Sequence, residues 1–522
     1  MDSAASMPTV ADIVRHHGRT RPDRVALYFE GQSVSYGELD RRASRVAQGL
    51  IAAGIKPQAR IAILAKNDLA FFELWFGAAK AGAVLVPVNF RLAPPEIAYV
   101  VNDAKAELLF VGHDFYPLVE KVSSELASVR RVVALHGEHP EWPGYAVWVA
   151  AQEARDPDLP IAAADVAIQM YTSGTTGHPK GAQLSHANLL ALIPGAIARV
   201  GRWHERDVSL VCMPLFHIGG SGWALLALYR GVPNLVTRDF EPAAILRLIA
   251  EYRVTKVLFV PAMLLFLLQV PQCSDSDFSS LELIVYGASP APLDLLRNAL
   301  RTFRCALGQL YGLTESTGGI AYLAPEDHGE HAVERMRSCG RPLDGVEIKV
   351  VDAGGQELPP GEVGEVICRT PQVMLGYWNL PEATARAVRD GWLHTGDAGY
   401  RDKDGYLYIY DRIKDMIISG GENIYPAEVE SALFGHPAVA DVAVIGVPDE
   451  QWGEAVKAIV VKKPGASLGA DELIGFARER IAGYKVPRSV DFVAALPRNP
   501  SGKILKRELR KPYWVSRTRQ IN

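Results

Sequence analysis

One eleven-residue run, YTSGTTGHPKG at Tyr171–Gly181, constrains the fold of this chain more than any other feature. It follows an apolar stretch, Val166–Met170, and it precedes a helical stretch. Three glycines allow backbone N–H groups to close on an oxyanion, four hydroxyls add donors, and Lys180 supplies a positive charge. The spacing differs from GxxxxGK[ST], so the run is not a Walker A loop. It predicts a phosphate-binding loop in an α/β fold.

Strands and helices alternate in the segments around this loop. Apolar runs at Ile61–Ala65 and Ala83–Val88 stand on either side of a helical stretch at Leu69–Ala81. This spacing predicts parallel strands joined by a helix, and the alternation recurs near Leu235–Gln269 and Leu283–Tyr311. A chain of 522 residues exceeds what one hydrophobic core supports, so we expect at least two domains.

The pattern of the sequence changes after Pro325. Short apolar runs separated by Gly- and Asp-rich turns, such as DAGGQE and RDKDG, predict a small β-rich subdomain. Beyond Asp411, strand patterns at Val442–Val447 and Ala455–Lys462 accompany a helical pattern at Asp471–Ile481. These segments predict a small α+β domain in the C-terminal part of the chain.

Composition and charge argue against several classes of protein. The net charge of −4 gives no general attraction to nucleic acid, so none is expected as a partner. The N-terminus has no apolar core of signal-peptide length, and Val257–Val270 is too short to span a bilayer and contains Pro261. We expect a cytoplasmic protein without an integral membrane segment. Neither a disulfide framework nor a zinc site is expected, because the cysteines are far apart and include no CxxC pair. They are Cys212, Cys273, Cys305, Cys339 and Cys368.

Four further motifs follow the loop: YGLTES at Tyr311–Ser316, TGD at Thr395–Asp397, YDRIKDMIISGGENIYP at Tyr410–Pro426 and PRNPSGK at Pro497–Lys503. Together with the loop, and in this order, they resemble the adenylate-forming superfamily. That superfamily comprises acyl-CoA synthetases, which are AMP-dependent acid–CoA ligases, together with peptide-synthetase adenylation domains and luciferases. The resemblance covers nearly the whole chain.

The resemblance implies an α/β fold of two domains. The large N-terminal domain, residues 1–411, is expected to bind AMP and the acyl group and to contain two helix-flanked sheets plus a small β-barrel-like subdomain. A small, mobile α+β C-terminal domain, residues 412–522, is expected to carry the catalytic lysine.

The chemistry of individual side chains suits nucleotide binding. Tyr311 can stack on a purine, Thr314 can bind the α-phosphate, and Glu315 is a hard oxygen ligand suited to Mg²⁺. The carboxylate of Asp397 can accept both ribose hydroxyls, and Arg412 can reach the same ribose. The resemblance implies the same roles. The full set of expected cofactor-binding residues is Thr172, Ser173, Gly174, Thr175, Thr176, Gly177, Lys180, Gly287, Ala288, Ser289, Tyr311, Gly312, Asp397 and Arg412.

The segment GASPA at Gly287–Ala291 supports two interpretations. The resemblance places Gly287–Ser289 beside adenine and the acyl pocket. The segment also approaches the G-x-S-x-G elbow of serine hydrolases, but that mechanism needs an oxyanion donor from the residue after the serine. Pro290 has no N–H, so we reject a serine hydrolase.

The expected catalytic residues are Lys503, Thr314, Glu315 and His217. Under the resemblance, Lys503 neutralises charge that builds on the α-phosphate and carboxylate oxygens as they join. His217 is expected to border the acyl site without an acid–base role. Small residues near it leave volume for a bulky acyl group, which predicts a medium or long fatty acid or a cyclic acid. The expected acyl pocket comprises His217, Gly220, Ser221, Gly312, Gly318 and Gly319.

The resemblance also implies a hinge and a coenzyme A site. The hinge is expected at Lys414, two residues after Arg412, and the pantetheine tunnel beside the SGGEN segment. Adjacent glycines allow the backbone to approach a narrow ligand closely. The expected CoA-binding residues are Ser419, Gly420, Gly421, Glu422, Trp452 and Gly453.

The predicted function is an acid–CoA ligase. An acid and ATP give acyl-AMP and pyrophosphate, and CoA then gives the thioester and AMP, with ATP, Mg²⁺ and coenzyme A as cofactors. A homodimer is an open alternative. So is a free-standing adenylation enzyme that loads a carrier protein supplied in trans, although no GG-x-S carrier motif follows Lys503. A nucleotide-binding protein without catalysis is expected to lack Glu315 or Lys503, and the motifs alone do not distinguish luciferase-type oxidation.

Overall fold

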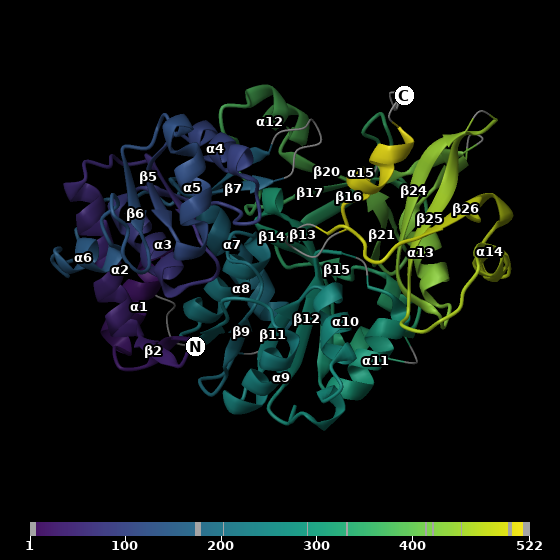
Figure 1. The fold of residues 1–522 in the computed structure, drawn as a ribbon, viewed down its shortest axis with the longest axis horizontal. Coiled ribbons are helices and arrows are strands. Elements are labelled where there is room, and N and C mark those ends of the chain that lie inside the picture. Colours follow the sequence, from purple (N-terminus) through teal and green to yellow (C-terminus); the bar gives the residue numbers. More distant parts are fainter. Residues whose placement is uncertain are drawn as a thin grey trace.

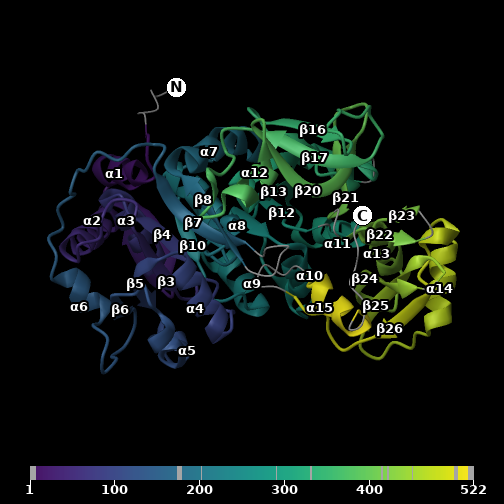
Figure 2. The same ribbon diagram turned by 90° about the horizontal axis from the view of Figure 1, so that it is seen from above.

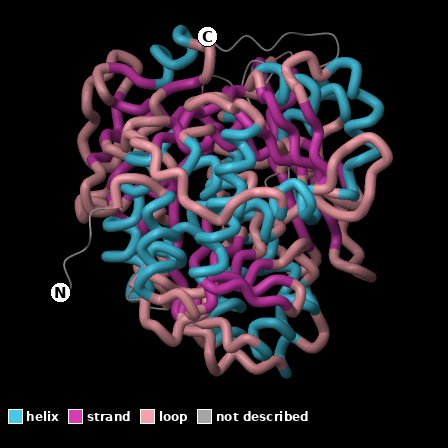
Figure 3. Tube along the Cα trace, turned by 90° about the vertical axis from the view of Figure 1, so that its left-hand side faces the viewer, coloured by secondary structure: helices cyan, strands magenta, loops and turns pink. Residues whose placement is uncertain are grey.

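The computed structural model describes residues 7–172, 179–201, 203–289, 291–329, 332–412, 415–419, 422–449, 451–498 and 504–514. Figure 1 shows two large sheets side by side, a smaller sheet above them and a separate C-terminal unit at the right. In Figure 3, helices lie on both sides of the strands, as the alternating sequence pattern predicts.

The first sheet has seven strands in the described residues, in the order β18-β8-β7-β4-β3-β5-β6. Its strands are β18 (Gly376–Tyr377), β8 (Lys180–Ser185), β7 (Val166–Thr172), β4 (Val84–Pro87), β3 (Arg60–Leu64), β5 (Ala106–Val111) and β6 (Arg131–Ala134). β3 and β4 are parallel, which confirms the prediction from their spacing.

The phosphate loop precedes a helical stretch, as the sequence predicts, but a strand that was not predicted comes before the helix. The loop joins β7 to this antiparallel strand, β8. The helix α7 (His186–Val200) begins only after Ser185, whose hydroxyl caps the N–H of Asn188 at 3.1 Å. Residues 180–185 stay extended because they pair along β7 and bury Ala182 and Leu184.

The second sheet has nine strands in the described residues, in the order β15-β14-β13-β12-β11-β9-β10-β1-β2. Its strands are β15 (Arg341–Pro342), β14 (Gly318–Leu323), β13 (Ala306–Leu313), β12 (Leu283–Gly287), β11 (Lys256–Phe259), β9 (Ser209–Val211), β10 (Asn234–Val236), β1 (Val25–Phe29) and β2 (Gln32–Ser35). The strands from β1 through β13 in this order are parallel, while the edges are antiparallel.

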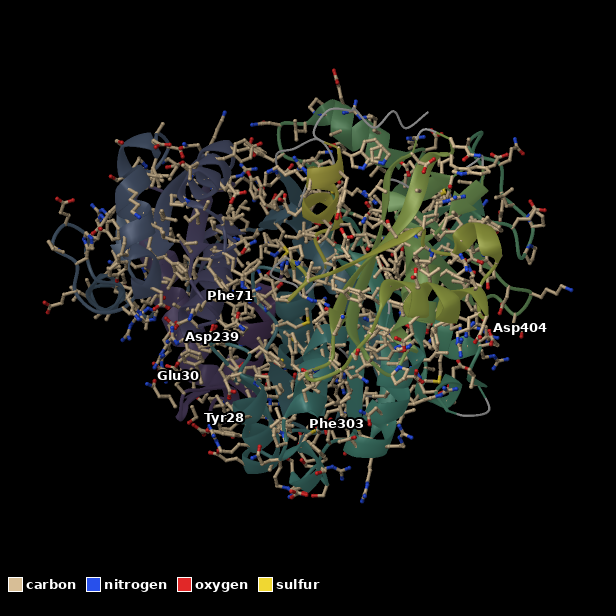
Figure 4. The ribbon with its side chains drawn as sticks, turned by 45° about the vertical axis from the view of Figure 1, so that its right-hand side comes forward. Tyr28, Glu30, Phe71, Asp239, Phe303 and Asp404 are labelled. Atoms are coloured by element: carbon tan, nitrogen blue, oxygen red, sulfur yellow. The ribbon has the colours of Figure 1, made fainter. Side chains whose placement is uncertain are left out.

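Helices fill the space between the two sheets and cover their outer faces. The helix α3 (Leu69–Ala81) is buried on every side, with Trp75 and Phe72 fully inaccessible, as expected for a helix that is apolar all round. Figure 4 places Phe71 of this helix deep among side chains, whereas Asp404 lies at the molecular edge. The other helices of this part are α1 (Ala11–Thr20), α2 (Tyr36–Ala52), α4 (Pro94–Asp103), α5 (Tyr116–Val122), α6 (Tyr145–Ala150), α8 (Ile218–Tyr229), α9 (Pro242–Glu251), α10 (Pro261–Gln269) and α11 (Leu293–Phe303).

The β-rich subdomain is confirmed as a third, antiparallel sheet. Asp397 lies within one of its strands, β20, and not in a turn. Its strands are β16 (Glu347–Val351), β17 (Gly364–Arg369), β19 (Val388–Arg389), β20 (Trp392–Arg401) and β21 (Leu407–Arg412), and the helix α12 (Pro381–Ala387) lies beside them.

The C-terminal unit is an α+β structure, as predicted. Figure 2 shows it as a distinct body beside the three sheets. The helices α13 and α14 pack on one face of its sheet and α15 on the other. Its elements are β22 (Ile417–Ser419), β23 (Glu422–Ile424), α13 (Pro426–Phe434), β24 (Val439–Asp449), β25 (Gly453–Lys462), α14 (Ala470–Arg478), β26 (Ser489–Phe492) and α15 (Lys506–Arg510). In the part of the chain described, no helix has the length and apolar character needed to cross a bilayer.

Candidate active site

Three sheets meet at the predicted nucleotide site. β7 and β8 of the first sheet carry Thr172 and Lys180 at the two ends of the phosphate loop. β13 of the second sheet carries Tyr311 and runs into a 3₁₀ turn, Thr314–Ser316, that presents Glu315. β20 of the third sheet carries Asp397. The fold therefore brings the loop, YGLTES and TGD motifs together at one place.

The phosphate loop starts and ends at one fixed point. Thr172 and Lys180 are cross-strand partners on β7 and β8, so the loop closes a hairpin. The predicted phosphate ligands Ser173, Gly174, Thr175, Thr176 and Gly177 lie outside the described residues, and their roles stay predictions.

Glu315 is held by two hydroxyl groups. Thr172 Oγ1 donates to Glu315 Oε1 at 3.2 Å, and the hydroxyl of Tyr377 donates to the same oxygen at 2.8 Å. Among the described residues, no hydrogen bond reaches Glu315 Oε2. The described residues also contain no cluster of three His, Cys, Asp or Glu side chains able to hold a metal. A single carboxylate suits Mg²⁺, which commonly takes one or two protein carboxylates and completes its shell with substrate phosphates and water.

The predicted adenosine residues also lie together. The hydroxyl of Tyr311 donates to Asp397 Oδ2 at 2.5 Å, and Asp397 is 5% exposed. Arg412 is the cross-strand partner of Asp397 on β21, which places its backbone at the predicted ribose position. The side chain of Arg412 lies outside the described part of the structure. These contacts agree with the predicted roles, which remain predictions.

Two glycines of the motifs permit very close approach of neighbouring strands. A Cβ at Gly312 would stand 1.8 Å from the carbonyl oxygen of Gly318, and one at Gly287 would stand 2.3 Å from the carbonyl oxygen of Leu310. Any side chain would therefore push β12, β13 and β14 apart. The close approach fixes the turn that presents Glu315.

Two of the small residues expected to line the acyl pocket, Gly220 and Gly319, are small for another reason. A Cβ at Gly220 would stand 2.3 Å from the carbonyl oxygen of Pro214, and one at Gly319 would stand 2.4 Å from Leu310 Cδ1. The backbone carbonyl of Pro214 therefore demands glycine at position 220, whereas at position 319 the side chain of Leu310 would have to move. The small size of these two residues is not evidence for free volume. The expectation of spare volume beside them needs correction, although their place in the pocket stays a prediction.

The space beside Gly222 and Gly318 is looser. A Cβ at Gly222 would meet Ile218 Cδ1 at 3.5 Å and Leu192 Cδ2 at 3.7 Å, and one at Gly318 would meet the same two side chains at 3.6–3.7 Å. These are ordinary contact distances. Two separate elements, α8 and β14, therefore face one apolar spot close to Glu315. Ser221, also predicted to line the pocket, is fully buried and donates to the carbonyl of His217 at 3.1 Å.

His217 precedes the first turn of α8 and packs against Phe216, with ring centroids 4.3 Å apart. Its Nε2 is buried and has no hydrogen-bond partner among the described groups. Burial, with a smaller contribution from Arg91, lowers the pKa of His217 to about 4. The imidazole is therefore neutral at pH 7, which agrees with a lining role and no acid–base role.

The predicted CoA residues gather on the C-terminal unit. Ser419 on β22 and Gly453 on β25 are cross-strand partners, although they lie far apart in the sequence. Trp452 is 37% exposed, and the guanidinium of Arg488 lies 5.0 Å from its ring centroid. The other residues predicted for CoA binding, for the hinge and for catalysis lie outside the residues that the structure describes. They are Lys414, Gly420, Gly421, the Glu422 side chain and Lys503. Glu422 is a partial exception, because its backbone belongs to β23.

Sequence reasoning missed two aromatic contributions. Tyr377 reaches Glu315 from a two-residue strand, and its motif, GYW, carries no distinctive spacing. Tyr410 on β21 stacks on Tyr425 just before α13, with ring centroids 4.6 Å apart and planes at 17°. Tyr410 and Tyr425 are the first and the next-to-last residues of one motif, so the sequence singled them out, but no local pattern predicts that they stack or that Tyr377 contacts Glu315.

Comparisons with known proteins agree with this geometry. Residues 14–378 match the AMP-binding enzyme family model, and residues 428–503 match the model of the AMP-binding enzyme C-terminal domain. The chain is 42% identical to a fatty acid–[acyl-carrier-protein] ligase of Streptomyces coeruleorubidus, over 99% of this chain and 98% of the relative. It is 41% identical to a feruloyl-CoA synthase of an Amycolatopsis species, over 95% and 97% of the two chains.

A solved structure is similar along the same length. The anthranilate CoA ligase crystallised with anthranoyl-AMP superposes with a TM-score of 0.91 at 28% identity, over 97% of this chain and 98% of the other. Sequence and structure therefore agree over both domains. The chain belongs to the AMP-binding enzyme family, the adenylate-forming superfamily, and is an AMP-forming acid–CoA ligase.

Proposed function

We propose that this enzyme joins a medium or long fatty acid, or a cyclic carboxylic acid, to coenzyme A through an enzyme-bound acyl-adenylate. The observation that carries the proposal is that β13 and the turn that follows it present both groups: Tyr311, which is bonded to Asp397, and Glu315, which is held through Oε1. One end of this site suits a metal-bound polyphosphate and the other suits a nucleoside, which together describe ATP.

The reaction takes place in two steps. A carboxylate oxygen of the acid attacks the α-phosphorus of ATP, an acyl–O–P bond forms, and pyrophosphate leaves. The thiol of CoA then loses its proton, its sulfur attacks the acyl carbon, and AMP leaves with the electrons of the broken C–O bond.

Residues of this chain orient the reactants. The proposed contacts are Asp397 to the ribose, Thr314 and Lys180 to phosphate oxygens, and Lys503 to the charge that develops during adenylation. Magnesium held at Glu315 would supply shielding for the negative phosphate oxygens.

The two steps are proposed to use two orientations of the C-terminal domain, residues 412–522. Both steps act on the same acyl and α-phosphate groups, yet adenylation is proposed to need Lys503 and thioester formation the face formed by Ser419 and Gly453. A rotation about Lys414 supplies both in turn. Hinges of this kind absorb a large backbone change at one or two residues.

Two observations support the class of acid. Leu192, Ile218, Gly222 and Gly318 surround an apolar spot beside the Glu315 turn. Relatives that cover nearly the whole chain are named for a fatty acid and for ferulic acid, which are both bulkier than acetate.

A carrier protein is the second candidate for the thiol acceptor. The relative at 42% identity is named as a ligase of an acyl-carrier protein, while the one at 41% is named as a CoA synthase. The acceptor thiol in both cases would belong to a pantetheine arm, so one tunnel suits either.

The test is a panel of acids from acetate to long-chain fatty acids and cyclic acids. Each acid is assayed for AMP release with ATP and Mg²⁺, with CoA, with a phosphopantetheinylated acyl-carrier protein, or without acceptor. We expect AMP release to rise strongly with CoA and one class of bulky acid, and thioester to accumulate in equal amount. A rise with the carrier protein alone would favour the second candidate, and acetate as the best acid would overturn the proposed substrate class.

A further inference from the structure

We propose that Tyr377 is a positioning residue that sets the metal-binding carboxylate of Glu315 relative to the phosphate-loop lysine, Lys180. This inference rests on the proposed function of the site. Tyr377 is not part of any of the five motifs that identify the superfamily. Its role follows from where a short segment, residues 371–378, crosses between the sheets; we call this segment the strap.

The strap joins the third sheet to the first. Its last strand, β18, pairs antiparallel with β8, and Tyr377 is the cross-strand partner of Ala182. Because β8 begins at Lys180, the strap lies directly beside the end of the phosphate loop. Tyr377 therefore lies beside β8, which carries Lys180 and pairs with the strand that carries Thr172.

Backbone hydrogen bonds on both sides of Tyr377 hold the strap in place. The N–H of Leu375 donates to the carbonyl of Gln183 at 3.0 Å, and the N–H of Trp378 donates to the carbonyl of Gly181 at 2.8 Å. Trp378 is anchored further by a guanidinium, with Arg60 Cζ 3.5 Å from its ring centroid. Tyr377 thus has little freedom to move along β8.

The strap is also tied to the turn that carries Glu315. The N–H of Met374 donates to the backbone carbonyl of Glu315 at 2.9 Å, and Thr317 Oγ1 donates to the carbonyl of Gln372 at 2.5 Å. Backbone and side chain of Glu315 are therefore both held from the strap. A residue fixed in this way orients a ligand group at low entropic cost.

The direction of the hydroxyl hydrogen bonds selects one oxygen of the carboxylate. Tyr377 and Thr172 both donate to Glu315 Oε1. Two donors on one oxygen fix the plane of the carboxylate and leave the other oxygen directed away from them. Metal-binding carboxylates are held by such outer hydrogen bonds, and losing one weakens metal binding. We infer that Oε2 is the oxygen presented to Mg²⁺.

The ring of Tyr377 has a second task. Lys180 Nζ lies 5.1 Å from its centroid, within the range of a cation–π contact. One side chain thus holds a cation against its face and a carboxylate at its hydroxyl. Since the ring is rigid, the separation of these two opposite charges is set before ATP arrives.

Two variants separate the two tasks. Tyr377→Phe removes the hydroxyl and keeps the ring, whereas Tyr377→Leu removes both. ATP is titrated into each protein in a calorimeter at a series of Mg²⁺ concentrations, with no acid present. We expect Tyr377→Phe to raise the half-saturating Mg²⁺ concentration roughly ten- to hundredfold, the effect of one lost outer hydrogen bond to a metal-binding carboxylate. Its affinity for ATP at saturating Mg²⁺ should stay close to wild type, while Tyr377→Leu should weaken both.

Tyr145→Phe is the matched control. Its hydroxyl donates to another carboxylate, Glu73, at 2.7 Å, in the buried interior and away from the phosphate loop. It should lower the melting temperature without changing the dependence on Mg²⁺. Thr172→Val, which removes the second donor to Glu315, should act in the direction of Tyr377→Phe.

Failure of this inference differs from failure of the proposed function. A wild-type protein that does not bind ATP with Mg²⁺ contradicts the proposed function before any variant is compared. A wild type that binds, beside a Tyr377→Phe protein with unchanged dependence on Mg²⁺, overturns the positioning role alone. An equal shift in Tyr145→Phe would show that the effect is a general loss of stability and would also overturn it.

Discussion

The nucleotide site and the C-terminal domain are attached to the rest of this molecule in different ways. Hydrogen bonds between the three sheets hold the nucleotide site. Thr172 and Tyr377 of the first sheet bind Glu315 at the end of β13, and Tyr311 of the second sheet binds Asp397 of the third. The C-terminal domain follows β21, and the ring of Tyr410 stacks on Tyr425 across the proposed boundary. The first arrangement is a network with several members, whereas an aromatic contact can part and form again at small cost.

The difference matches two separate functions, ATP binding by fixed groups and service of two successive steps by a movable domain. Groups that bind ATP gain from being fixed in advance, since no free energy is then spent on orienting them. Groups that must serve two steps in turn need a joint whose orientations lie close in free energy. The following experiments test this contrast between a fixed site and a movable domain, in order of decreasing expected effect.

The largest effect is expected for Lys503 on the movable domain. Lys503→Ala should slow formation of acyl-AMP by roughly 10²–10³, the scale of losing one group that stabilises developing charge. Conversion of synthetic acyl-AMP and CoA to thioester should proceed normally. Single-turnover measurements of the two steps decide the point.

Lys506→Ala serves as the control for Lys503, because Lys506 pairs with Glu430 inside the C-terminal domain at 2.9 Å. It should leave both steps unchanged. Equal loss of both steps in Lys503→Ala would mean that the C-terminal domain does not alternate between two orientations. The contrast between a fixed nucleotide site and a movable domain would then be wrong.

The next effect concerns the acyl side of the fixed site. Gly222→Val should fill the space between Leu192 and Ile218 and lower activity on long or bulky acids more than on short ones. The change in preference should be roughly 10–200-fold, the usual value of one methylene-sized contact in an apolar pocket. The ratio of kcat/KM for a long and a short acid measures it.

Gly222→Ala is the control, since a single Cβ there meets Ile218 at an ordinary 3.5 Å. It should keep the wild-type preference for chain length. An identical loss on every acid in Gly222→Val would place Gly222 outside the pocket. Gly319 is a poor probe because its Cβ would collide with Leu310.

A third experiment uses pH to compare the stability of the two regions. Burial lowers the pKa of His17, His186 and His217 to about 4, and all three lie in residues 1–411, while residues 412–522 contain a single histidine, His436. Because the ordinary value is about 6.5, the unfolded chain takes up these protons first, so the N-terminal domain should lose stability as the pH falls from 6.5 towards 4. Calorimetry at several pH values should show its transition moving further than that of the C-terminal domain.

A single variant sharpens the pH comparison. His186 Nδ1 accepts from the N–H of Val10 at 3.3 Å, which requires the unprotonated nitrogen, and an asparagine oxygen can replace it. His186→Asn should reduce the slope of stability against pH by at most about 1.4 kcal/mol per unit. His204→Asn, at an exposed position, is the matched control for the substitution itself. If the slope of stability against pH is unchanged in His186→Asn, groups other than His186 cause it.

The smallest effect is expected at the proposed boundary between the two domains, where Tyr410 stacks on Tyr425. Tyr410→Ala removes a stacked pair worth roughly 0.5–1.5 kcal/mol, so the two half-reaction rates should shift by a few-fold in opposite directions. Trypsin should also cut faster at the link that contains Arg412 and Lys414. Rates from single turnovers and the rate of cleavage are both measured.

Tyr425→Ala should reproduce these changes from the other side of the boundary. Tyr408→Ala is the control, because Tyr408 stacks on Tyr400 within the third sheet, with centroids 4.7 Å apart. If Tyr408→Ala changes cleavage as much as Tyr410→Ala, the stack across the boundary has no special part in holding the domain.

Much of the fold could be predicted from local patterns. The spacing of apolar residues identified α3 and the parallel pair β3 and β4, since helix and strand periods differ and each is visible within a short window. The strand β8 was missed. Its six residues begin with Lys180 and Gly181 of the motif and end where the capping residue Ser185 starts a helix, so the local signal for a helix concealed the strand.

The candidate site shows the same limit at the level of side chains. Glu315 could be recognised from its motif because a carboxylate beside hydroxyl groups suits a metal. Its partners could not, because Tyr377 lies 62 residues away and Thr172 lies 143 residues away along the chain. The small size of Gly220 was likewise visible in the sequence, whereas the carbonyl of Pro214 that demands it was not.

The sequence by itself determined which residues have the chemistry expected for binding phosphate, ribose and metal, and it determined the order of the motifs that identifies the chain as an AMP-forming acid–CoA ligase. Those properties belong to side chains and to short runs of backbone, so they can be read residue by residue. Only the tertiary structure decided that the strap crosses from the third sheet to β8, that Tyr377 meets both Glu315 and Lys180, and that Tyr410 stacks on Tyr425. Such contacts depend on how whole sheets pack against one another, and no local pattern in the chain records that packing.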